Sequence, residues 1–296
     1  QILMAFLILT GSLGALLAYI IGEGSALFSL FGGSKLAWSV IFWSVGSYFV
    51  WRGLLVVKNF ERIFSFIVIS IIIFLSAYFL PQIKAENFFY FDISKIFLPY
   101  GVILFALSAT PAIAESHALL PNNPKAFRRA LVIGTLIPIV VYVLFAVATV
   151  GVMGLSSTEI ITVGLGQKFG ARISIISNVF AILAMGTGFV GLGTALRDGL
   201  HWDCKLPSWF SGFLVITIPL LLFLGGITGF VTVLEIVGGL FISTESILLV
   251  LVYWKAKKRG DIKSGFVAHH SMLMGVPVLI VFTVVAFLSV YKIFIQ

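Results

Sequence analysis

Long apolar stretches, divided by short polar segments, dominate this chain. Runs of roughly 20 apolar residues have the length of a helix that crosses a bilayer. About nine such runs occur, near residues 3–21, 36–57, 63–80, 98–120, 130–153, 172–196, 208–224, 229–254 and 271–293. The segments between them are too short to form a soluble domain. The pattern predicts an all-α, multi-spanning helical bundle that forms one membrane domain over residues 1–296.

The composition supports a membrane protein and narrows its chemistry. Hydrophobic residues make up 60% of the chain and charged residues 10%, and the mean hydropathy is +1.16. That leaves too little polar surface for a soluble globule, so we expect the lipid bilayer as the surrounding medium. The single cysteine, Cys204, excludes an intramolecular disulfide and a Cys-based metal site. We expect no cofactor other than a coupling ion.

The net charge of +8 follows the expected topology and does not indicate nucleic-acid binding. If the chain starts in the cytoplasm, 13 of the 19 Lys and Arg residues lie in inward connections and 6 in outward ones. This asymmetry is what the positive-inside rule requires. The opposite orientation would place the basic segments AFRRA (126–130) and WKAKKRG (254–260) outside. We therefore predict a multi-pass protein of the cell membrane with a cytoplasmic start.

The run from Leu98 to Pro121 carries an unusual polar interruption at Ser108, Thr110 and Pro111. Proline lacks an amide proton and clashes with the carbonyl four residues earlier, so the helix is expected to break there. Thr110 can cap a new half-helix with proline at its first position. Broken helices of this kind form the central sites of secondary transporters. The alternative is a proline kink, which is common in membrane helices.

Acidic residues inside apolar runs are expensive and often functional. Glu115 follows the expected break, and it is either a gate or proton carrier or the partner of a nearby arginine. Glu235 and Glu245 lie ten residues apart in one run. At 100° per residue they are on different faces, so we expect no paired-carboxylate site. The hydroxyls of residues 243–246 are expected to bond their own backbone carbonyls.

Motifs for enzyme chemistry are missing or fall in the wrong context. Gly186, Gly188 and Gly191 match G-x-G-x-x-G but lie inside an apolar run with no strand before them, which indicates close helix packing. The four histidines lack metal-ligand spacing, and no G-x-S-x-G nucleophile elbow occurs. The chain is therefore expected not to be an enzyme.

Several segments resemble amino acid permeases of the aromatic and hydroxy amino acid branch of the amino acid, polyamine and organocation superfamily. GALLAYIIGEGSALFSLFGG (14–33) is similar to the third helix of such permeases, and RGLLVVKNFERIFSFIVIS (52–70) to the turn between the fourth and fifth. PYGVILFALSATPAIAE (99–115) is similar to their broken sixth helix, and MGTGFVGLGTALRDGL (185–200) to the end of the eighth. The nine runs would then be helices three to eleven.

The resemblance implies a LeuT-type inverted-repeat transporter fold, with substrate held between broken helices one and six. Only a partial fold is expected here, because the first two helices are missing from the sequence and Gln1 is not an initiator methionine. We expect a longer gene product; the alternative is a reduced relative.

A zwitterionic amino acid needs partners for its carboxylate and its ammonium. The amides around Ala112 to Ala114 offer a helix N-terminus to the carboxylate, and the carbonyls from Phe105 to Ser108 offer acceptors to the ammonium. The expected substrate site comprises the residues of the break and one more distant tyrosine, namely Phe105, Ser108, Ala109, Thr110, Pro111, Ala112 and Tyr19. Tyr19 has an alternative role as an interface anchor.

The coupling ion is expected to be a proton or sodium. The resemblance makes Thr187 a candidate hydroxyl ligand for sodium, while Glu115, Glu235 and Glu245 are candidates for coupling or gating. We predict a secondary active symporter for amino acids, neutral or aromatic, that works by alternating access. The alternatives are a nutrient sensor on the same fold and a transporter of another small organic solute.

Overall fold

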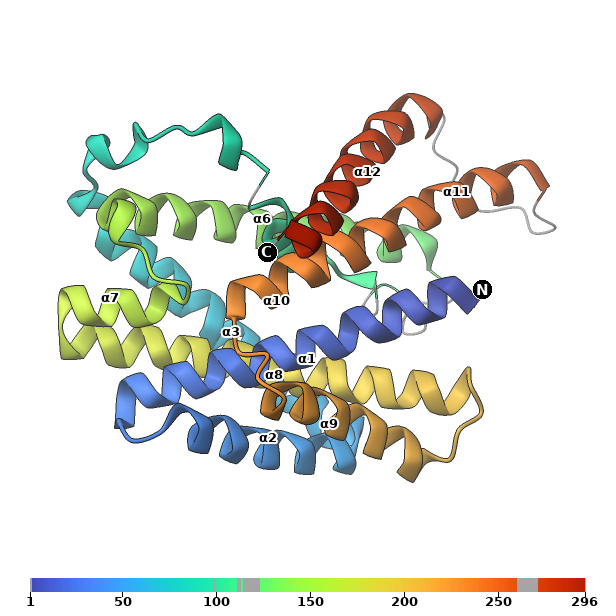
Figure 1. Ribbon diagram of the computed structural model, residues 1–296, viewed down its shortest axis with the longest axis horizontal. Helices are drawn as coiled ribbons and strands as arrows, with labels where there is room; N and C mark the ends of the chain where they lie inside the picture. The colour runs from blue at the N-terminus through green and yellow to red at the C-terminus, as the bar shows by residue number, and fades with distance from the viewer. Residues whose placement is uncertain (1, 98, 111–112, 114–122, 260–270, 296) are drawn as a thin grey trace. The chain divides into compact units, whose positions relative to one another are not determined.

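The computed structural model describes residues 2–97, 99–110, 113, 123–259 and 271–295. Every regular element in these ranges is helical. The longer helices, shown in Figure 1, are α1 (Ile2–Phe31), α2 (Lys35–Arg52), α3 (Leu54–Phe79), α4 (Tyr100–Leu107), α6 (Pro124–Met153), α7 (Ile161–Phe169), α8 (Ala171–Trp202), α9 (Ser208–Leu224), α10 (Phe230–Ile236), α11 (Ser243–Arg259) and α12 (Ser271–Ile295). Short 3₁₀ turns are η1 (Leu80–Gln82), η2 (Ala85–Phe88), η3 (Ile93–Lys95) and η4 (Gly154–Ser156), and a π-helical turn, η5 (Val237–Ile242), joins α10 to α11.

The chain divides into two compact units. Unit 1 comprises residues 1–12, 92–135 and 231–296, and unit 2 comprises residues 13–91 and 136–230. Helices α1 and α6 are each divided between the two units, α1 after Ser12 and α6 after Thr135. Each unit is therefore assembled from segments that lie far apart in the sequence.

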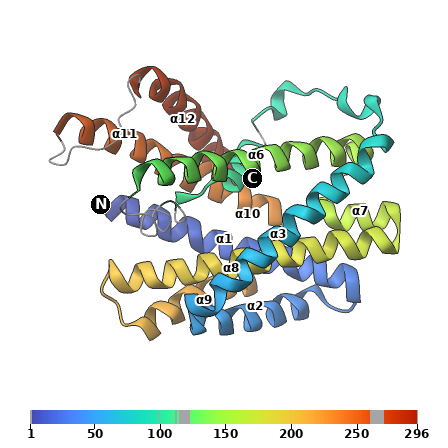
Figure 2. The same cartoon turned by 180° about the vertical axis from the view of Figure 1, so that it is seen from behind.

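Unit 2 is built around the long helix α8. Helices α2, α3, α7 and α9 all pack against it, and Figure 2 shows α3 crossing it. Side chains from four helices form a buried apolar cluster: Leu75, Phe79, Ala148, Val152, Met153, Leu165 and Ile173. In a bilayer, helices associate through van der Waals packing of such side chains, so this cluster stabilises unit 2.

The segment after α3 holds the C-terminal end of α6. The side-chain amide of Asn87 donates to the carbonyl of Gly151 at 2.7 Å, and the backbone amide of Lys84 donates to the same carbonyl at 3.0 Å. A helix leaves its last carbonyls without partners inside the helix, and these two donors satisfy one of them. The connections 84–95 and 154–170 contain the short elements η2, η3, η4 and α7.

Unit 1 is organised by a close contact between α4 and η5. A Cβ on Gly238 would lie 1.7 Å from the carbonyl oxygen of Gly101, and a Cβ on Gly101 would lie 2.7 Å from the carbonyl oxygen of Glu235. Because these neighbours are backbone atoms, only glycine allows the two helices to approach so closely. Helix α12 packs against η5 and α11. In Figure 1, α10, η5 and α11 follow one another along one rod.

The helix bounds correct two predicted runs. The run 36–57 is divided at Gly53, where a φ of +85° ends α2 and α3 begins one residue later. Positive φ at this angle favours glycine, and the turn falls within the segment 52–70 that resembles a turn between two helices of amino acid permeases. The run 3–21 continues as α1 to Phe31.

Six helical segments in the described part of the chain are long and apolar enough to cross a membrane. They fall in α1, α3, α6, α8, the α10–α11 rod and α12, and α9 is a shorter apolar helix. The expected total of about nine spans stays a prediction.

One face of α6 carries exposed apolar side chains at helical spacing. Leu136, Val140, Val143 and Val147 are all between 42% and 56% exposed. A stripe of this kind is unfavourable in water and suited to lipid. The structure therefore supports a helical membrane bundle.

Candidate functional site

The expected interruption lies at the end of α4. The helix ends at Leu107, and Ser108 is extended, with φ −70° and ψ 127°. The amide of Ser108 donates to the carbonyl of Phe105 at 3.3 Å, and helical backbone begins again at Thr110. The predicted break is confirmed at this point of the chain.

The second half-helix begins earlier than expected. The amide of Ile113 was expected to be free for a ligand, but it donates to the carbonyl of Ala109 at 3.0 Å. That expectation was wrong for Ile113 because Ala109 already acts as the first acceptor of the new turn, and only the amides before the first bond lack a partner inside the helix. The other predicted residues of this segment, Pro111, Ala112 and Glu115, lie outside the described residues.

Thr110 connects the break to the α10–α11 rod. Its side chain interacts with the carboxyl group of Glu245 through a hydrogen bond. Glu245 is only 6% exposed, and its Oε1 atom has no hydrogen-bond partner in the described part of the protein. A substrate residue and a coupling residue that were predicted separately therefore meet within unit 1.

The neighbours of Glu245 behave as expected from their sequence. The hydroxyl of Ser243 donates to the carbonyl of Gly238 at 3.2 Å, and that of Thr244 donates to Leu240 at 2.7 Å. These hydroxyls satisfy backbone groups beside the π-helical turn. They leave Glu245 as the acidic group that faces the break.

Glu235 has a different partner. It forms an ion pair with Lys292 of α12 at 2.5 Å, and the side chains of Glu235 and Lys292 are 14% and 40% exposed. The prediction that Glu235 and Glu245 do not form one paired site agrees with these separate partners. The angular argument behind it needs correction, however, because η5 lies between the two acids and a π turn rotates less per residue than an α-helix.

Two further predicted residues, Tyr19 and Thr187, belong to unit 2. Tyr19 of α1 packs against Gly188 of α8, where an added Cβ would lie 2.9 Å from the tyrosine hydroxyl oxygen. The hydroxyl of Thr187 is within hydrogen-bond distance of two carbonyls of its own helix, 2.8 Å from Leu183 and 3.1 Å from Ala184. The contacts at Gly186 and Gly188 confirm that these glycines serve helix packing.

Sequence reasoning overlooked Glu23. This residue is 0% exposed, and neither carboxyl oxygen has a hydrogen-bond partner among the described residues. It was missed because the first apolar run was expected to end at residue 21, whereas α1 continues to Phe31. The available signal was an acidic residue within the quoted segment 14–33.

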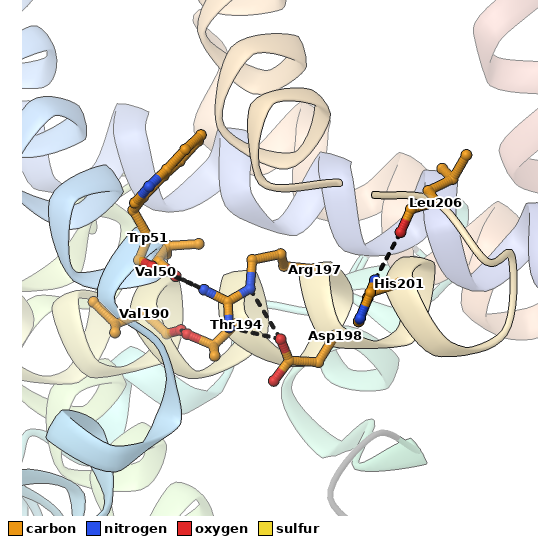
Figure 3. Close-up of polar contacts among 8 residues, drawn as sticks. All are labelled: Val50, Trp51, Val190, Thr194, Arg197, Asp198, His201 and Leu206. Atoms are coloured by element: carbon orange, nitrogen blue, oxygen red, sulfur yellow. Dashed lines mark hydrogen bonds and ion pairs between the residues drawn. The ribbon is translucent and has the colours of Figure 1, made fainter. Parts of the chain in front are cut away.

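A second overlooked group joins α2 to α8. In Figure 3 the guanidinium of Arg197 points to the end of α2, where its Nη1 donates to the carbonyls of Val50 at 2.6 Å and Trp51 at 3.1 Å. The same guanidinium bonds one oxygen of Asp198 through Nε at 2.9 Å and Nη2 at 2.7 Å. Arginine is suited to this place because its planar fork carries several donors. It satisfies terminal carbonyls of α2 directly before the turn at Gly53.

Comparison with known proteins identifies the class. Residues 1–290 match the model of the tryptophan/tyrosine permease family, and the chain belongs to that family. Over 268 residues it is 28% identical to tyrosine-specific transport system 1 of Haemophilus influenzae, which covers 81% of this chain and 66% of that protein. Over 286 residues it is 27% identical to tyrosine-specific transport system 2 of the same organism, covering 86% and 68%. Over 199 residues it is 26% identical to glutamine transporter 2 of Aliivibrio fischeri, covering 62% and 51%.

The family and the apolar helices together indicate a multi-pass membrane protein. They also place the chain in a permease family and not among enzymes, in agreement with the expectation from its motifs. The matches span between 51% and 68% of the length of the three relatives. The activity and substrate of the whole protein are therefore matters for proposal.

Proposed function

We propose that this protein is a secondary active transporter for amino acids. The observation that carries the proposal is the interruption after Leu107, together with the hydrogen bond from Thr110 to the buried Glu245. A broken helix leaves backbone donors and acceptors free, and secondary transporters bind small polar solutes at such breaks within the membrane. The hydrogen bond between Thr110 and Glu245 links the break to α11.

The substrate would lie against the two ends of the break. Its carboxylate would face the N-terminal end of the half-helix that begins near Thr110, and its ammonium would face the carbonyls between Phe105 and Ala109. The exposed side chain of Ser108 is available for a further hydrogen bond. Pro111 and Ala112 would complete the same substrate-binding segment.

The amino acid is proposed to be aromatic. The family description and two relatives named as tyrosine-specific support this choice. The relative named as a glutamine transporter supports a second candidate, a neutral amino acid with a polar side chain. The role of Tyr19, which belongs to unit 2, stays a prediction from the sequence.

Transport would be a symport driven by a proton or sodium gradient, with alternating access on a LeuT-type fold and a cytoplasmic start. Because Glu245 bonds Thr110, movement at the break would be transmitted to α11, so we assign Glu245 to gating. Glu235 and Glu115 are retained as gating candidates, and the pair with Lys292 supports that role for Glu235. Thr187 would supply one oxygen ligand to sodium in the sodium-coupled alternative.

Uptake into proteoliposomes tests the proposal. The full-length protein is reconstituted and offered radiolabelled tyrosine, tryptophan, phenylalanine, glutamine and serine, with sodium and proton gradients imposed separately. Gradient-driven uptake of an aromatic amino acid is the expected result. No uptake of any amino acid by the folded protein would favour the sensor or a transporter of another solute.

The variant Thr110→Val tests the site, because it keeps the side-chain shape and removes the hydroxyl. Loss of a hydrogen bond costs about 0.5–1.5 kcal/mol, so uptake should fall by roughly two- to tenfold. Thr135→Val is the matched control, since the Thr135 hydroxyl donates only to Leu131 of its own helix at 2.8 Å. Equal uptake by both variants would contradict a role for Thr110.

A further inference from the structure

Glu23 is a buried acid that the proposed substrate site does not use. It lies in α1 within unit 2, it is 0% exposed, and both carboxyl oxygens lack a hydrogen-bond partner among the described residues. An ionised carboxylate in such surroundings is strongly disfavoured unless a counter-charge or several donors face it. A bound proton or cation would remove or balance the charge of this buried carboxylate.

The packing around Glu23 is close and mostly apolar. A Cβ on Gly186 of α8 would lie 3.4 Å from Glu23 Oε1 and 4.0 Å from the ring of Phe42 of α2. The next residue of α1, Gly24, faces Ser39 of α2, whose hydroxyl donates to the carbonyl of Ile20. The glycine at 186 lets the Glu23 carboxyl lie close to α8.

Few titratable groups face this carboxyl. Tyr19 lies four residues earlier on α1 and therefore on the same helical face, and Tyr142 of α6 interacts electrostatically with Tyr19. From α8 the facing position is Gly186, and from α2 the ring of Phe42 lies near the same position. The salt bridges found in the described ranges do not include Glu23.

The surroundings favour a proton over a metal cation. Hard cations require several oxygen ligands, whereas the neighbours named above are a glycine, an aromatic ring and one tyrosine. No group of three or more His, Cys, Asp and Glu residues that could hold a metal occurs within the described residues. A proton needs only one carboxyl oxygen and removes the charge that burial disfavours.

We propose that Glu23 is a proton-binding site in unit 2 and that its loading and release couple substrate movement to the proton gradient. The coupling part of this inference rests on the proposed transport function; the proton-binding part does not. Between the loaded and the released state, one proton moves from water to the carboxylate oxygen and back, and no other bond is made or broken.

Glu23→Gln separates coupling from transport, because glutamine imitates the permanently protonated side chain. If one proton moves with each substrate, a gradient of about one pH unit sustains roughly tenfold accumulation, since each 1.4 kcal/mol is tenfold. The variant should lose this accumulation but retain exchange of labelled for unlabelled substrate at equal pH. Glu23→Asp should regain part of the accumulation. Glu86→Gln, the same change at an exposed acid with a 76% exposed side chain, should behave as wild type.

Infrared difference spectroscopy of the reconstituted protein tests proton binding without transport. The carbonyl band of a protonated carboxylic acid should be present in wild type near neutral pH, and it should disappear in Glu23→Gln but not in Glu86→Gln. A spectrum unaffected by Glu23→Gln would overturn the proton-binding site. If the band is lost but accumulation persists, the coupling role is overturned. If wild type transports nothing, the proposed function and the coupling role both fail, and the infrared result alone decides whether Glu23 binds a proton.

Discussion

Replacement of Arg197 by methionine should destabilise unit 2 more than any ordinary surface substitution. The side chain of Arg197 is 13% exposed and that of its partner Asp198 is 14% exposed, so both charges are largely removed from water. Methionine retains much of the arginine stem but none of its donors. The carboxylate of Asp198 and the carbonyls of Val50 and Trp51 would each lose the partner that Figure 3 shows.

The expected magnitude follows from the four hydrogen bonds of the Arg197 guanidinium, two to Asp198 and one each to the carbonyls of Val50 and Trp51. Breaking a buried ion pair by removing one partner costs about 3–5 kcal/mol, because the remaining charge stays buried. The carbonyls at the end of α2 are adjacent to the turn at Gly53, where water can replace part of the lost bonding. We therefore expect a loss of about 3–5 kcal/mol in the free energy of unfolding of Arg197→Met.

A double variant separates the ion pair from the helix-end contacts. Arg197→Met with Asp198→Asn removes both charges, so its cost should be smaller than that of Arg197→Met alone, with a coupling energy of about 1–3 kcal/mol. Arg197→Lys should fall between wild type and Arg197→Met, since a lysine cannot serve both α2 carbonyls and Asp198 with a planar fork.

Unfolding in mixed micelles of a mild detergent and SDS, followed by tryptophan fluorescence, measures these differences. Thr194→Val is the control, because the hydroxyl of Thr194 donates at 2.6 Å to Val190 of its own helix, one turn from Arg197 (Figure 3). It should cost about 1 kcal/mol or less. If Arg197→Met unfolds within about 1 kcal/mol of wild type, the reasoning from buried charge is refuted.

Three other predictions follow from the packing and topology. Gly238→Ala should strongly lower the thermal stability in detergent, because its Cβ would overlap the carbonyl oxygen of Gly101 in α4. Gly199→Ala on α8 is the control, since its Cβ would have no atom within 4 Å, and it should be neutral or stabilising by up to about 1 kcal/mol. Equal melting temperatures of the two variants would contradict the α4–η5 contact. Lys292→Met should cost about 1–3 kcal/mol, because it leaves the Glu235 carboxyl, whose side chain is 14% exposed, without its partner. Glu235→Gln should relieve part of that cost in a double variant; an additive double variant would argue against the ion pair. In cells, Cys204 should react with an impermeant maleimide only from the cytoplasmic side, because the proposed cytoplasmic start places this exposed cysteine in an inward connection; labelling of intact cells from outside would contradict the cytoplasmic start.

The break in the chain between residues 107 and 110 illustrates what local chemistry can predict. Proline at 111 lacks the amide that would bond the carbonyl of Leu107, and its ring clashes with that carbonyl, so an interruption after Leu107 follows from covalent structure alone. The location of the long helices follows in the same way from apolar length. The confirmed features, the break and the long helices, both depend on residues that are close together in the sequence.

The errors have a common physical origin. The division of α2 from α3 depends on a positive φ at one glycine, and the extension of α1 beyond residue 21 depends on packing that tolerates a buried glutamate. The angle between Glu235 and Glu245 was changed by a π turn, which closely packed glycines in α4 and η5 accommodate. None of these features changes the spacing of apolar residues along the sequence, so the apolar pattern could not predict them.

The sequence by itself determined a helical membrane protein with an interrupted helix, because hydrophobic length, charge asymmetry and proline act locally along the chain. Only the tertiary structure decided which polar groups meet. Thr110 bonds Glu245 across a gap of more than a hundred residues, Lys292 pairs with Glu235, and Arg197 reaches the end of α2. Glu23 is a candidate site because the structure buries it, since the same acid on an exposed helix end would be an ordinary solvated side chain. Long-range packing decides such pairings because it sets the distance and the access to water on which electrostatic and hydrogen-bond energies depend.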